Sequence, residues 1–150
     1  MLGTAGASLG KWHRLIRDFD AVVATSGQRD YTTLQAADDV LDAAAYSMYV
    51  KEGTYAAGLT VSTNNVYIFV EAGTVVQAAI TLSGTGITLI LGAQCDVQGV
   101  VTLSGANCSL ICLGGVDIDG INVTGNTCHV DGGGWDTISD GGTATHGISV

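Results

Sequence analysis

Hydrophobic and polar residues alternate in a short phrase that returns about every 21 residues through the middle of the chain. The phrase reads LTVS at 59–62, ITLS at 80–83, VTLS at 101–104 and INVT at 121–124. Alternation with a period of two is typical of a strand with one buried face. A fixed repeat of this length is typical of architectures whose units stack on one another. The pattern therefore predicts a β-solenoid.

Each repeat contains three strand-like segments, and aligned repeats place apolar residues in columns. The expected interior columns are Leu59/Ile80/Val101/Ile121, Val61/Leu82/Leu103/Val123, Val66/Ile87/Cys108/Cys128, Ile68/Leu89/Leu110/Val130, Val70/Leu91/Cys112, Thr74/Cys95/Val116 and Val76/Val97/Ile118. The intervening turns STNN, SGTG, SGAN and TGNT are rich in residues that tolerate positive φ. We expect an all-β fold, a three-sided parallel β-solenoid whose coils lie about 4.8 Å apart.

The four cysteines, Cys95, Cys108, Cys112 and Cys128, all fall in interior columns, and no two form a C-x-x-C pair. We expect small buried apolar side chains rather than zinc ligands. A disulfide between Cys108 and Cys128, in neighbouring coils, stays open as an alternative. Unpaired cysteines fit a protein made in a reducing cytosol.

A helix at about 32–45 is expected to cap the first coil, because the open end of a solenoid exposes its core. Leu34, Ala37, Val40, Leu41 and Ala44 recur at helical spacing. The N-cap would be Thr32 or Thr33. The segment AYSMYVKEGTY at 45–55 would then open the first coil.

Charge divides the chain unevenly. Residues 1–17 hold three of the five basic residues and no acid, whereas the rest holds two basic residues and all 14 acids. Such an acidic body disfavours nucleic acid as a partner. No apolar run is long enough for a membrane span, so a membrane partner is not expected either.

The segment KWHRLIRDF at 11–19 precedes the repeats and is amphipathic. We expect residues 1–19 to form an N-terminal attachment arm and residues 20–150 the solenoid. The alternative is a strap across the cap helix. The expected attachment residues are Lys11, Trp12, Arg14, Leu15 and Arg17.

Outward positions of the second segment place Phe69, Ile90 and Ile111 in one column, beside Tyr67. An aligned set of large apolar side chains on a surface normally marks a contact. We expect these four residues to form an oligomer interface. The alternative is that a loop of the same chain covers them.

The third segment directs Asp96, Asp117 and Asp119 outward, together with Gln77 and Gln98. Carboxylates on adjacent coils suit acid–base catalysis or Ca²⁺ binding. A solvated polar face that keeps the solenoid soluble is the simpler interpretation. We expect no metal ion and no cofactor.

The segment at 128–147 interrupts the period, since 27 residues separate Ile121 from Ile148. We expect it to loop out from one corner, with HGISV at 146–150 as the first strand of a further coil, so that the chain is cut off within that coil. Trp135, Asp136 and Asp131 in this loop form a candidate glycan contact. The alternative is a plain surface loop.

The stretch DAVVATSGQRDYTTLQAADDVLDAA at 20–44, with MYVKEGTY at 48–55, resembles the opening of right-handed parallel β-helix proteins of the pectin-lyase-like class. The most similar sequences are those of pectin methylesterases and of phage tailspikes and virion appendages. The resemblance covers roughly residues 20–55 and is more specific for fold than for function.

The phage resemblance implies a non-enzymatic structural component of a tailed-phage virion: a tail spike, a tail fibre or a head decoration. It implies a homotrimer made in the host cytoplasm, attached to capsid or tail proteins through its arm, with host surface polysaccharide as a further partner. The alternative is a carbohydrate-active enzyme of the pectin methylesterase or polysaccharide lyase type. For that alternative GGVDIDG at 114–120 suggests Asp117 as nucleophile, but no arginine follows Arg29 to bind a substrate carboxylate.

Overall fold

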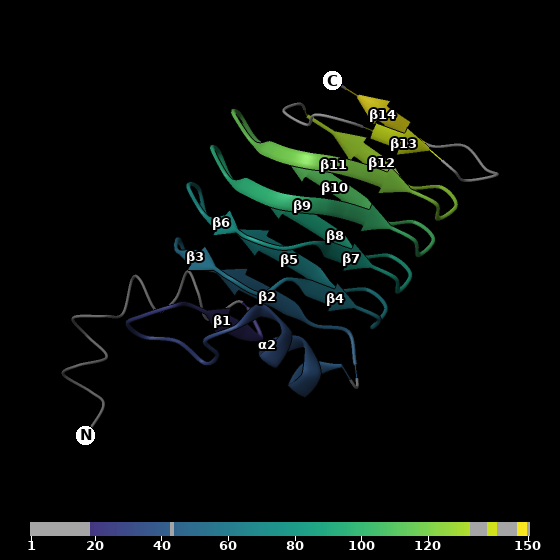
Figure 1. Ribbon diagram of the computed structural model, residues 1–150. Helices are drawn as coiled ribbons and strands as arrows, with labels where there is room; N and C mark the ends of the chain where they lie inside the picture. The colour runs from purple at the N-terminus through teal and green to yellow at the C-terminus, as the bar shows by residue number, and fades with distance from the viewer. Residues whose placement is uncertain (1–18, 43, 133–137, 141–146, 150) are drawn as a thin grey trace.

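The computed structural model describes residues 19–42, 44–132, 138–140 and 147–149 of the 150-residue chain. These residues form a parallel β-solenoid of about four turns with a short helix at its N-terminal end (Figure 1). The all-β fold, the parallel stacking and the spacing of about 21 residues are as the sequence predicts. The described part of the chain holds no helix long or apolar enough to cross a membrane.

Sheet A is built from one strand of each coil and stacks in register. Its strands, in spatial order, are β1 (Ala21–Val23), β2 (Ser47–Val50), β5 (Tyr67–Val70), β8 (Thr88–Leu91), β10 (Ser109–Cys112), β12 (His129–Asp131) and β14 (Gly147–Ser149). All neighbouring pairs are parallel. Because the pairs carry no register shift, each outward position forms a straight column along the stack.

Sheet B contains the other two segments of each coil. Its strands are β3 (Thr54–Tyr55), β4 (Leu59–Val61), β6 (Val75–Val76), β7 (Ile80–Leu82), β9 (Asp96–Leu103), β11 (Asp117–Val123) and β13 (Ile138–Asp140). In the upper coils the two segments merge into single strands, β9 and β11. A register shift between Ile118 and Gly120 marks the bend between them.

The interior columns are those that the alternation predicts. Val61, Leu82, Leu103 and Val123 are fully buried, and the matching residues of the other columns are buried as well. All four cysteines are buried and free, so the Cys108–Cys128 disulfide is not formed. The one polar residue in these columns, Thr74, donates its hydroxyl hydrogen to the Glu71 carbonyl at 2.7 Å.

The turns explain the glycine and asparagine content. The left-handed conformation recurs at one turn of each coil, at Asn65, Gly86, Asn107 and Thr127, and at a second turn, at Gly73, Gln94 and Gly115. A second glycine column lies where consecutive turns stack closely: a Cβ on Gly105 would lie 1.8 Å from the Gly84 carbonyl oxygen. Larger residues are excluded there by the turn below.

The cap helix α2 spans Leu34–Leu41, shorter than the expected 32–45, with Thr33 as its N-cap. Val40 is 64% exposed, and Ala44 lies beyond the helix and is exposed. Both follow the expected helical spacing, but neither lies on the buried face. The buried face instead includes Asp38, which follows Leu34 at i+4 and is 3% exposed.

The strand β1, which the repeat pattern did not predict, precedes the helix and pairs with β2 at the bottom of sheet A (Figure 1). The next loop covers its outer edge: the Val22 carbonyl accepts hydrogen bonds from the backbone N–H groups of Asp30 and Tyr31. The lower edge of β4 is covered by α2, because the Gln35 side chain bonds both the N–H and the C=O of Thr60. The N-terminal end of the solenoid is therefore closed by the chain itself.

Residues 128–147 were expected to form a single loop, and this prediction is wrong because the segment contains two strands. β12 continues sheet A, and Ile138 of β13 pairs with Ile121 of β11. Ile148 pairs with Val130, so Gly147–Ser149 form a strand of sheet A, which is the second segment of a coil and not the expected first segment. The last coil is shorter than the others, which is why the fixed period failed to find it.

Candidate contact surface

The outer face of sheet A carries a column of large side chains, one from each of five neighbouring strands. We call this column the apolar stripe, and its members are Val22, Tyr49, Phe69, Ile90 and Ile111. Each is half-buried, whereas the residues beside them on each strand point inward and are buried. The exact register follows from the unbroken parallel ladder of sheet A.

Aromatic rings gather at the lower end of the stripe. The rings of Tyr49 and Phe69 stack with centroids 5.7 Å apart. Phe19 packs edge-on against Tyr49 at 5.2 Å and lies 6.2 Å from Tyr67. Such pairs contribute about 0.5–1.5 kcal/mol each beyond the area they bury. Phe19 therefore fixes the start of the described chain on this face.

Polar contacts border the stripe at its lower corner. The Tyr49 hydroxyl donates to Glu71 Oε1 at 3.1 Å, and the backbone N–H of Glu52 donates to Glu71 Oε2 at 2.6 Å. Burial, with help from the Glu71 carboxylate, raises the pKa of Tyr49 to about 12. Tyr49 therefore stays neutral at physiological pH, and the stripe carries no charge of its own.

The structure brings the four expected interface residues together. Phe69, Ile90 and Ile111 are consecutive members of the stripe, and Tyr67, 40% exposed, stands in the adjacent outward column. Their role as an interface stays a prediction. Tyr49 and Phe19 were missed, because the alignment started after them; extending the column of Phe69 downward by one coil would have found Tyr49.

Of the predicted attachment and glycan-contact residues, Asp131 lies within the described part of the chain. All five attachment residues, Lys11, Trp12, Arg14, Leu15 and Arg17, lie outside the described residues, as do Trp135 and Asp136. Asp131 is exposed at the upper end of sheet A, where it pairs with Ile111. The structure therefore places one of the three glycan-contact candidates.

The acidic side chains of sheet B lie on adjacent coils as expected. Asp96 and Asp117 are direct partners in the ladder, and Gln98 donates to Asp96 Oδ2 at 2.8 Å. Asp119 and Gln77 are exposed. Within the part of the chain that the structure describes, no group of three or more histidines, cysteines and carboxylates could hold a metal ion.

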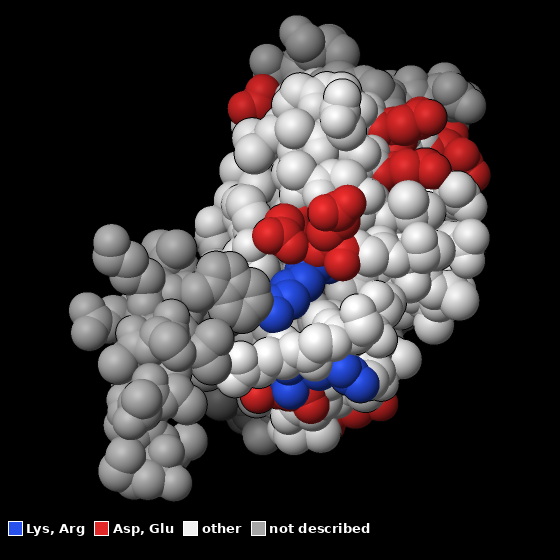
Figure 2. Space-filling view, turned by 90° about the vertical axis from the view of Figure 1, so that its left-hand side faces the viewer, with Lys and Arg blue, Asp and Glu red and all other residues white. Residues whose placement is uncertain are grey.

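Basic side chains are confined to the N-terminal half of the described structure. They are Arg29 and Lys51, whose side chains donate to the backbone carbonyls of Gly27 and Gln28. In Figure 2 the blue side chains lie in the lower half of this face, while red side chains extend to its top. No lysine or arginine follows Lys51 in the sequence, so none lies beside the carboxylates of sheet B on later coils.

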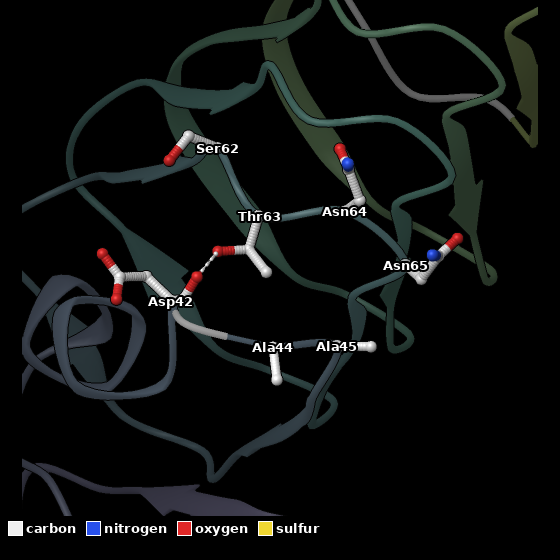
Figure 3. A pocket seen from close by; sticks show the side chains of 7 residues that line it. All are labelled: Asp42, Ala44, Ala45, Ser62, Thr63, Asn64 and Asn65. Carbon is white, nitrogen blue, oxygen red and sulfur yellow. Dashed lines mark hydrogen bonds between the residues drawn. The ribbon is translucent and has the colours of Figure 1, made fainter.

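A hollow opens where the end of α2 meets the first coil (Figure 3). It is lined by Asp42, Ala44, Ala45, Ser62, Thr63, Asn64 and Asn65. The Thr63 hydroxyl donates to the Asp42 carbonyl at 2.8 Å, which ties the helix end to the first turn. Asp42 is the one titratable side chain that lines the hollow, so the hollow offers no acid–base pair. The hydrogen bond between Thr63 and Asp42 connects the cap helix to the first coil.

No family model, no curated protein and no solved structure matches this chain.

Proposed function

We propose that the protein is a non-enzymatic structural component of a tailed-phage particle, such as a tail spike, a tail fibre or a head decoration. The observation that carries the proposal is the apolar stripe, which gives one face of sheet A the character of a contact surface. The resemblance of residues 20–55 to the opening of phage appendages supports the same assignment. The fold alone would suit many functions.

The stripe is suited to contact between copies of the chain. The net charge of the chain is −9, so two copies repel each other over most of their surface. The stripe is uncharged and presents five large side chains at the strand spacing of about 4.8 Å. We expect sheet A of one copy to face its neighbours around a threefold axis, giving a homotrimer.

The arm, residues 1–19, would attach the trimer to capsid or tail proteins. Its three basic residues favour an acidic docking surface. Asp131, Trp135 and Asp136 lie towards the opposite end of the chain and would contact host surface polysaccharide. In this arrangement the protein is made in the host cytoplasm and ends in the virion.

A carbohydrate-active enzyme is the second candidate, favoured by the pairing of Asp96 with Asp117. A separation of about 5 Å suits a retaining pair of carboxylates. The absence of any lysine or arginine after Lys51 weighs against it, because a pectin-like substrate needs a clamp for its carboxylate. Release of methanol or of reducing ends from pectin, lost in Asp117→Asn, would establish the enzyme instead.

Incorporation into particles tests the proposal. Particles purified from cells that encode the chain should contain it in multiples of three copies, as measured by quantitative mass spectrometry. Reversing Arg14 and Arg17 to Glu should reduce incorporation about tenfold, and more than the matched change of both to Gln, because reversal adds repulsion. Circular dichroism should stay unchanged in both variants. A chain absent from purified particles would overturn the proposal.

A further inference from the structure

Cys108 and Cys128 occupy one interior column in two neighbouring upper coils. They immediately precede β10 and β12, whose ladder pairs Ser109 with His129, and the backbone N–H of His129 donates to the Cys108 carbonyl at 2.8 Å. The two cysteines are therefore direct neighbours along the stack, at the strand spacing of about 4.8 Å. Disulfides join residues whose Cα atoms lie about 4.4–6.8 Å apart, so this spacing permits a bridge.

Both thiols lean towards the coil below their own. The Cys128 thiol donates to the Gly105 carbonyl at 3.2 Å, and Gly105 belongs to the coil of Cys108. The Cys108 thiol donates in the same way to the Gly84 carbonyl, also at 3.2 Å. A single change of the Cys108 rotamer would turn its sulfur towards that of Cys128. This change breaks only hydrogen bonds of a thiol, which is a weak donor.

Burial protects the two thiols in the reduced protein. Both side chains are buried in the core. Burial raises the pKa of Cys108, and the neighbouring Cys128 thiol adds to the rise, although backbone hydrogen bonds oppose it. Because the thiolate is the reactive form, a raised pKa slows oxidation while the coils stay closed. The sulfurs are reached by a small oxidant when the upper coils open locally.

We propose that Cys108 and Cys128 form a redox switch, a dithiol that hydrogen peroxide converts into a disulfide between two coils. The Cys128 sulfur attacks one peroxide oxygen and the O–O bond breaks, which gives a sulfenic acid and one water. The Cys108 sulfur then attacks the Cys128 sulfur. The S–S bond forms, the S–O bond breaks, and a second water leaves with the thiol proton. Two thiols thereby lose two electrons and two protons, and one peroxide is reduced to two waters.

The bridge would fasten the upper coils of the solenoid to each other. It closes the loop between the two cysteines, which restricts the unfolded chain and stabilises the folded one. A thiol reductant reverses the bridge by thiol–disulfide exchange. The switch lies in the interior of the solenoid and does not depend on the proposed function.

Mass spectrometry of the full chain tests the switch. The chain is treated with hydrogen peroxide, its remaining thiols are alkylated, and a protease that cleaves before aspartate is added. Asp117 and Asp119 separate the two cysteines, so a peptide with Cys108 should be found linked to one with Cys128, until dithiothreitol separates them. Cys108→Ala and Cys128→Ala should each abolish the link. Cys112→Ala, the matched change at another buried thiol, should keep it.

Thermal unfolding followed by circular dichroism gives a second readout. Peroxide should raise the melting temperature of the parent by about 5–10 °C and leave that of Cys108→Ala unchanged. Spectra recorded before treatment establish that each variant is folded. A treated parent that stays fully alkylated, or that carries sulfinic acid without a link, would overturn the proposal. A link that persists in Cys108→Ala would do the same, because another pair of cysteines would then form it.

Discussion

At the scale of the residue, side-chain alternation decides most of this structure. Leu103 is fully buried, and its chain neighbour Thr102 points outward, half-buried. The difference is visible in the sequence because a period of two assigns every side chain of a strand to one face.

Leu103→Asp should destabilise the fold by several kcal/mol, because it buries a carboxylate without a partner. Thr102→Asp, one residue away on the outer face, is the matched control and should cost less than about 1 kcal/mol. Denaturant unfolding followed by circular dichroism measures both. Equal stability of the Leu103→Asp variant and the parent would show that the register of the coils is wrong.

At the scale of the element, the cap helix shows where sequence reasoning fails. Helical spacing of apolar residues selected Val40 and Ala44, whereas the helix ends at Leu41 and buries Asp38. A buried carboxylate becomes tolerable because Tyr46 donates its hydroxyl hydrogen to Asp38 Oδ1, and Gln35 donates to Oδ2 at 3.1 Å. Tyr46 is eight residues away from Asp38 and lies outside the helix, so the helical spacing does not predict this hydrogen bond.

The buried carboxyl predicts a dependence of stability on pH. Burial raises the pKa of Asp38 above its usual value, and the neighbouring Asp39 and Asp42 add to the rise, although the hydrogen bonds from Tyr46 and Gln35 oppose it. The folded state therefore binds this proton more tightly than the unfolded state does. This contribution to stability is complete below about pH 3.9, the unfolded value, and is lost as pH rises through the folded pKa.

Asp38→Asn removes this titration. The free energy of unfolding of the variant should therefore gain on that of the parent as pH rises from 3 to 7. Asp119→Asn, at an exposed residue of β11, is the control and should run parallel to the parent. Urea unfolding at a series of pH values measures the difference, and parallel curves for Asp38→Asn would refute the assignment.

At the scale of the whole molecule, the regular repeats made the fold predictable. The strands at the two ends of the repeat array were not predictable, because the repeat is irregular there. The columns from Leu59 to Val130 could be aligned because each coil repeats the same length and turn. The strand β1 precedes the first full coil, and β13 belongs to a shorter one. Both strands lack the spacing of about 21 residues on which the alignment depended. Their positions follow from the strands with which they pair in the structure.

The candidate site follows the same rule. Phe69, Ile90 and Ile111 were predictable as an outward column because they lie in regular coils. Tyr49 joins them from the first coil, and Phe19, which precedes the strand β1, packs against Tyr49 on the outer face of sheet A. The molecule that binds the stripe could not be predicted, because its identity depends on the partner's sequence as well as on this one.

Sedimentation velocity of three full-length chains, over a range of concentration, tests the central claim that the apolar stripe is an assembly surface. The parent should shift from the 15.2 kDa monomer towards trimer as concentration rises. Ile90→Lys should associate at least about tenfold more weakly, because assembly would bury its charge. Val100→Lys, which adds the same charge on sheet B, should behave as the parent does. Association of Ile90→Lys equal to that of the parent, or a parent that stays monomeric throughout, would contradict the account.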